Sequence, residues 1–159
     1  SGATPASRGT RAPSRASTNN AASATTIDVQ TGAVLDVTGL DNGAILDALA
    51  LASGQTLKGN GTITGKTVAA SGSTIAPGAS PGILNTGDVT FNSGSTFDVE
   101  LYGATVGTGY DQLNVTGTVT LTVSTLGISR GYVPRAGTTF TAINNDASDP
   151  LTGPFARLP

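Results

Sequence analysis

A short motif that recurs along the chain constrains its fold more than any other feature. Each copy has a small residue, a glycine, one or two small polar residues and then an apolar residue. Six copies follow one another at intervals of roughly twenty residues, centred on Gly32, Gly54, Gly72, Gly94, Gly117 and Gly137. A turn and a strand repeated at this interval are typical of a solenoid whose coils stack on their neighbours. The motif predicts a β-solenoid of roughly six coils, with strands pairing in parallel between residues about twenty apart.

Alternation of apolar and polar residues predicts strands between these turns. From Leu113 to Val123 the apolar residues occupy odd positions and threonines fill most of the even ones, and Phe97, Val99 and Leu101 alternate in the same way. A period of two places the two sets on opposite faces of a strand. The side chains expected to point inward are Val29, Leu35, Leu57, Ile63, Ile75, Val89, Phe97, Val99, Leu101, Val115, Val119, Leu121 and Phe140.

The composition favours an all-β fold with a flat core. Charged residues make up 11% of the chain and aromatic residues 4%, while glycine is abundant at 22 residues. Small β-branched side chains suit a pleated surface, and frequent glycine disfavours long helices. An antiparallel β-sandwich is the alternative, and it would require hairpin turns between paired strands. Asn42-Gly43 and Asn60-Gly61 are candidate hairpin turns, but neither lies between two alternating runs.

The segment 1–25 differs in character from the rest of the chain. It is rich in Ser, Thr, Ala, Gly and Pro, and its charged residues are Arg8, Arg11 and Arg15. A segment without apolar periodicity cannot bury enough surface to offset its ordering entropy. We therefore expect residues 1–25 to form a flexible, disordered leader and residues 26–159 to form the solenoid.

The residue types that are absent limit the chemistry. The chain has no Cys and no His, and its formal net charge is −2 with the acidic residues concentrated after the leader. Such a chain lacks thiolate and imidazole ligands, and it lacks the basic stripe that nucleic-acid binding requires. No apolar run is long enough for a membrane-spanning helix. We expect no cofactor, no metal site, no nucleic-acid partner and no transmembrane segment.

Two groups of polar residues are candidates for a function beyond structure. Asp98 and Glu100 face the same side of a strand, as a catalytic carboxylate pair or a Ca²⁺ site would require, and Arg130 and Arg135 are candidate bases for a carbohydrate-active β-helix enzyme. A solvated strand face explains the acidic pair more simply. A one-sided threonine row, which could stack against a polymer, is formed by Thr116, Thr118, Thr120 and Thr122.

Two stretches resemble the passenger domains of bacterial autotransporters, in the type with autotransporter-associated β-strand repeats. They are Leu51 to Gly65 and Ile75 to Leu84, and the second contains the Ala-Pro-Gly-x-Ser-Pro-Gly turn. The strand-forming segments after this turn, up to Tyr110–Gly117, continue the likeness, which covers residues 51–145 well and 26–50 loosely. Its structural turn comprises Pro77, Gly78, Ser80, Pro81 and Gly82. Proline fixes φ and glycine reaches conformations closed to other residues, so both fit a corner.

The resemblance implies a right-handed parallel β-helix, export through a two-membrane envelope and display outside the cell. The function expected is a structural or adhesive passenger segment without catalysis. Expected partners are a host surface, a polysaccharide or neighbouring cells, together with adjacent coils or an outer-membrane translocator in the parent protein. A carbohydrate-active enzyme and a polymer-binding module are the alternatives.

Overall fold

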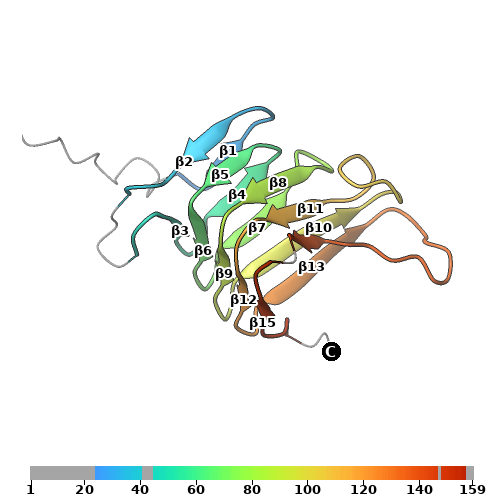
Figure 1. Cartoon of the computed structure of the whole chain (residues 1–159). Helices are drawn as coiled ribbons and strands as arrows, with labels where there is room; N and C mark the ends of the chain where they lie inside the picture. Colours follow the sequence, from blue (N-terminus) through green and yellow to red (C-terminus); the bar gives the residue numbers. More distant parts are fainter. Residues whose placement is uncertain (1–23, 41–44, 147, 157–159) are drawn as a thin grey trace, which may run out of the picture.

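The computed structural model describes residues 24–40, 45–146 and 148–156, and these residues form strands, turns and loops without a helix (Figure 1). Fifteen short strands make three parallel sheets of five strands each, and the chain visits the three sheets in turn as it completes each coil. The protein is therefore a right-handed parallel β-helix of about five coils. All pairings between named strands are parallel, which excludes the antiparallel sandwich for the described residues.

The strands of each sheet occur once per coil. Sheet I contains β1 (Thr26–Val29), β4 (Thr56–Gly59), β7 (Thr74–Pro77), β10 (Thr96–Leu101) and β13 (Thr125–Arg130). Sheet II contains β2 (Val34–Asp36), β5 (Thr62–Thr64), β8 (Ile83–Thr86), β11 (Gln112–Val115) and β14 (Ile143–Asn145). Sheet III contains β3 (Ala48–Leu51), β6 (Lys66–Ala69), β9 (Val89–Phe91), β12 (Val119–Leu121) and β15 (Leu151–Thr152).

Each strand of sheet I starts at a threonine, and these threonines are aligned from coil to coil. The aligned residues are Thr26, Thr56, Thr74, Thr96 and Thr125. The two central steps, from Thr56 to Thr74 and from Thr74 to Thr96, have the lengths that the glycine spacing predicted. The first and last steps are longer, because those coils carry extra residues in their connections. The stack therefore keeps its register although coil length varies.

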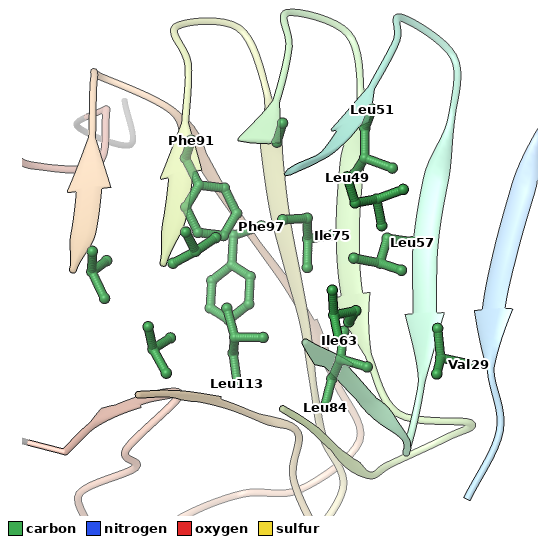
Figure 2. Packing of buried hydrophobic residues seen from close by; sticks show 14 of the residues in the cluster. Val29, Leu49, Leu51, Leu57, Ile63, Ile75, Leu84, Phe91, Phe97 and Leu113 are labelled. Atoms are coloured by element: carbon green, nitrogen blue, oxygen red, sulfur yellow. The ribbon is translucent and has the colours of Figure 1, made fainter. Parts of the chain in front are cut away.

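The interior is a column of aligned apolar side chains from all three sheets (Figure 2). Leu57, Ile75 and Phe97 lie in register on sheet I, and each is at most 1% exposed. Leu84 and Leu113 pair in the same way on sheet II. The structure thus confirms most of the residues predicted to point inward, with Leu35 and Leu101 only partly buried against the column.

The prediction that Phe140 points into the interior was wrong. Phe140 lies outside the interior column and contacts the rings of Tyr110 and Tyr132, with ring centroids 5.2 and 6.5 Å away. It belongs to the connection between β13 and β14, which contains no strand and projects away from the stack (Figure 1). Gly137 lies in the same connection, and its turn begins no further coil, so the stack has about five coils and not the six that the glycine count predicted.

The six repeat glycines are not one structural series. Gly54, Gly72 and Gly94 form equivalent corners that precede β4, β7 and β10, and Gly54 and Gly72 each donate an N–H to the carbonyl of the glycine in the next coil at 2.9 Å. Gly32 lies between β1 and β2, and Gly117 lies between β11 and β12. The three equivalent glycines have φ between 80° and 82°, a conformation that favours glycine.

Val123 occupies the glycine position of the corner that precedes β13. The register of Thr96 with Thr125 makes Val123 the counterpart of Gly94, and Val123 has a φ of 57°. A β-branched residue in this region is strained, at a cost of about 1–3 kcal/mol. Its side chain is 56% exposed and contributes little to the core.

The variant Val123→Gly is expected to raise the free energy of unfolding by about 1 kcal/mol, because relief of strain exceeds the entropic cost of the added glycine. Urea unfolding followed by circular dichroism measures this change. The control is Val133→Gly, at a residue that is 91% exposed and does not have a positive φ. A gain in the control as large as the gain at Val123 would contradict the strain argument.

The predicted leader falls largely outside the described residues, which begin at Ala24. The two described residues of that segment contact the second coil, at the start of β4. The carbonyl of Ala24 accepts a hydrogen bond from the Gln55 side chain at 2.7 Å, and the carbonyl of Thr25 accepts one from the Thr56 N–H at 2.9 Å. Packing of the β-helix therefore begins no later than Ala24.

Candidate functional site

The Pro-Gly turn forms the corner between sheets I and II at the middle of the stack. Strand β7 ends at Pro77, and the chain then turns through Gly78 and Ser80, which have φ of 98° and 105°, before β8 begins at Ile83. Gly78 and Gly59 exchange two backbone hydrogen bonds of 2.8 and 3.1 Å. The structure thus places Pro77, Gly78, Ser80, Pro81 and Gly82 at one corner.

Asp111 holds this corner against the next coil. Its Oδ1 accepts a hydrogen bond from the N–H of Gly82 at 2.7 Å, and its Oδ2 accepts one from the N–H of Glu100 at 2.8 Å. The residue is 1% exposed. Because both carboxylate oxygens are engaged by backbone donors, Asp111 connects the turn to β10 and acts as a structural clamp.

Burial changes the proton affinity of this clamp. Desolvation raises the pKa of Asp111 from 3.8 to about 6, although the hydrogen bonds from Glu100 and Gly82 oppose the rise. The neighbouring charges of Glu100 and Asp98 raise the pKa further. A buried carboxyl with a pKa near neutrality is frequent at functional sites, but structural networks produce the same effect.

A small pocket of about 150 Å³ lies beside the clamp, and several charged side chains line it. Its charged lining residues are Lys58, Asp98, Glu100 and Asp111. Asp98 and Glu100 therefore do share one face, as predicted. The Nζ of Lys58 lies 3.9 Å from Asp28 Oδ2 in a partly exposed ion pair, which contributes little stability.

The other candidate residues lie away from this pocket. Arg130 ends β13 and is exposed, and Arg135 lies in the connection between β13 and β14, so neither lines the pocket. Across the described ranges, no group of three or more acidic, Cys or His residues is arranged to hold a metal ion.

The predicted threonine row does not continue along one strand. Strand β12 spans Val119–Leu121 and contains Thr120, whereas Thr118 donates both its N–H and its hydroxyl to Asp88 Oδ1, at 2.9 and 3.2 Å. Thr120 instead aligns across coils with Thr90 and Thr152. Threonines therefore line up along the helix axis and not along a strand.

The buried role of Asp111 was missed in the sequence, although a signal for it exists. Asp111 has the same parity as Leu113 and Val115, whose side chains point inward. An acid at an inward position must find hydrogen-bond donors, since burying an unpaired carboxylate is costly. Parity alone does not reveal which backbone groups serve as donors.

The raised pKa of Asp111 predicts a pH-dependent stability. The folded chain keeps this proton to a higher pH than the unfolded chain, so the carboxyl contributes stability below about pH 4 that is lost as the pH rises through about 6. The contribution is at most about 3 kcal/mol. Asp111→Asn removes the titration, so the native chain should gain stability relative to the variant when the pH falls from about 7 to about 4.

Urea unfolding at the two pH values measures this difference. Asp146→Asn is the control. Hydrogen bonds from Ser148 lower the pKa of the exposed Asp146, so removing this group should change the pH dependence of stability in the opposite direction. The same pH dependence in the native chain and in Asp111→Asn would show that Asp111 is not the titrating group.

The arrangement of the strands defines the class of protein as a three-sided parallel β-helix. None of the protein-family models, curated proteins or solved structures that were compared with the chain matches it. The described part of the chain contains no helix that is long and apolar enough to cross a membrane.

Proposed function

We propose that this chain is a structural segment of an autotransporter-like protein that is displayed on the outside of the cell. The observation that carries the proposal is the threonine ladder from Thr26 to Thr125, which keeps one register through all the strands of sheet I. Coils of different length therefore start their sheet I strands at the same register. A segment built in this way suits the role of a rigid spacer.

The energetics of stacking support a spacer. Each coil buries its inner face against its neighbours, so stability is distributed along the stack and not concentrated at one centre. At a strand spacing of about 4.8 Å, five coils extend roughly 20–25 Å along the axis. The absence of cysteine agrees with a chain that is exported unfolded, since a disulfide would obstruct its passage.

The acidic pocket favours a structural role over carbohydrate-active catalysis. A general acid needs a proton that can reach the substrate. Asp111, the carboxyl with the raised pKa, is buried and has both oxygens engaged by backbone donors. Asp98 carries its carboxylate against Gly127 of the next coil, where an added Cβ would lie 2.7 Å from Oδ1. These contacts are typical of groups that hold coils together.

Surface labelling of intact source cells tests the proposal. An antibody raised against this chain should label unpermeabilised cells, and brief protease treatment should remove the signal. An antibody against a cytoplasmic protein serves as the control and should label only permeabilised cells. Labelling by the first antibody that also requires permeabilisation would contradict surface display.

A further inference from the structure

A column of asparagine side chains runs across the outer face of sheet II. Asn85, Asn114 and Asn144 are aligned on β8, β11 and β14. Asn114 Nδ2 donates to Asn85 Oδ1 at 3.0 Å, and Asn144 Nδ2 donates to Asn114 Oδ1 at 3.1 Å. Asn85 Nδ2 continues the series with a bond to the carbonyl of Gly61 at 3.1 Å. The result is an amide ladder that crosses three successive coils.

The amide ladder retains capacity for a ligand. A primary amide carries two N–H donors and two oxygen lone pairs. Each bond of the ladder uses one donor of one amide and one lone pair of the next. Because the amides recur at the strand spacing of about 4.8 Å, the remaining donors and acceptors recur at the same interval. Such a row matches an extended polymer better than a single small molecule.

An open groove of about 500 Å³ lies beside the ladder at Asn85 and Asn114, which form part of its wall. The opposite wall of the groove is formed by Val106 and Thr108, which lie in the connection between β10 and β11. That connection is held in shape by two backbone hydrogen bonds of 2.7 Å, from Tyr102 to Gly109 and from Gly109 to Thr105. The groove wall is therefore organised before any ligand arrives, which lowers the entropic cost of binding.

The lining of the groove is neutral and amphipathic. Amide and hydroxyl groups alternate with the apolar side chains of Ile83 and Val106, and no charged side chain takes part. The Oδ1 of Asn60, which also lines the groove, is buried without a hydrogen-bond donor among the described residues. This oxygen is enclosed by protein atoms, so the contacts open to a ligand come from the other amides and hydroxyls of the lining.

We propose that this groove binds a neutral, hydroxyl-rich polysaccharide along the amide ladder. Sugar hydroxyls both donate and accept hydrogen bonds, as amides do, and the C–H faces of sugar rings match Ile83 and Val106. Anionic polymers are recognised through Lys and Arg, which the lining does not contain. The inference goes beyond the proposed spacer role and rests on the proposed surface display for its biological meaning, but binding itself is a property of the purified chain.

Affinity electrophoresis of the purified chain tests the proposal. Gels contain a β-glucan, a mannan or a starch as neutral probes, and polygalacturonate as the anionic probe. Retardation by at least one neutral probe and not by polygalacturonate is the expected result. Absence of retardation by all the neutral probes, or equal retardation by the anionic one, would overturn the proposal. Surface labelling can succeed or fail independently of this result, so the two proposals fail in distinguishable ways.

Two groove variants and one control assign the binding to the groove. Asn114→Ala should weaken binding about tenfold, because it interrupts the ladder at its middle. Val106→Asp places a charge on the opposite wall without touching the ladder, and a loss of similar size is expected there. Thr120→Ala on the outer face of sheet III is the control and should bind as the native chain does. Thermal melts establish that each variant folds, and native affinity in both folded groove variants would refute the site.

Discussion

Replacing Gly59 with alanine is expected to lower the free energy of unfolding by about 4 kcal/mol, because the added side chain would meet the backbone of the neighbouring coil. A Cβ at this position would lie 2.2 Å from the backbone carbonyl oxygen of Val29. The φ of Gly59 is also 114°, which an alanine adopts only under strain. Neither the backbone of β1 nor that of β4 can yield without breaking their pairing.

Gly54→Ala is the matched control for this prediction. Gly54 has a φ of 82°, but no atom lies within 4 Å of the added Cβ. Its substitution therefore reports strain alone, with an expected cost of about 1 kcal/mol. Urea unfolding of the two variants separates close approach of the coils from backbone strain. Equal losses at both positions would show that β1 does not pack against Gly59.

Phe97→Ala is expected to lower the free energy of unfolding by about 3–5 kcal/mol, because it removes one of the two largest fully buried side chains. Phe97 is fully buried, and Figure 2 shows it beside Phe91. The ring of Phe97 lies 5.4 Å from the ring of Phe91 and 6.1 Å from the ring of Phe155. Phe155 follows β15, so this contact connects the end of the described chain to β10 in the fourth coil.

Phe140→Ala is the control for the aromatic core. Phe140 lies outside the column and contacts Tyr110 and Tyr132 instead, so its loss should cost much less than the loss of Phe97. Urea unfolding of both variants provides the comparison. A cost at Phe140 as large as that at Phe97 would place Phe140 in the core, as its alternation in the sequence first suggested.

The alternation of side chains could be predicted because period-two patterning depends only on the local chain. Leu57, Ile75 and Phe97 follow closely similar glycine turns, and their inward direction follows from the same parity. The number of coils was less predictable. A glycine motif marks a turn but does not say which corner the turn forms, so Gly117 and Gly137 were counted with Gly54 although they lie elsewhere.

Features that depend on register between coils were hidden from the sequence. The ladder residues Asn85, Asn114 and Asn144 are separated by steps much longer than the step from Thr56 to Thr74 on sheet I. A search at the interval of the glycine motif therefore passes over the amide ladder. Val123 was hidden for a related reason, because a search for glycine corners passes over the corner where valine occupies that position.

Engineered disulfides test the parallel, in-register stack most directly, and the native chain is suited to them because it contains no cysteine. Thr74 and Thr96 are register partners on adjacent strands of sheet I. Their Cα atoms should be about 5 Å apart, within the range that a disulfide spans. Thr74→Cys combined with Glu100→Cys is the control, since it is four residues out of register and displaced by about 13 Å along the strand.

Oxidation of the two purified double variants, followed by mass spectrometry of proteolytic fragments, gives the result. We expect rapid intramolecular cross-linking of the Thr74→Cys, Thr96→Cys pair, with a higher melting temperature after oxidation than before, and little cross-linking in the offset pair. Failure of the in-register pair to cross-link, or equally fast cross-linking of the offset pair, would contradict the parallel β-helix.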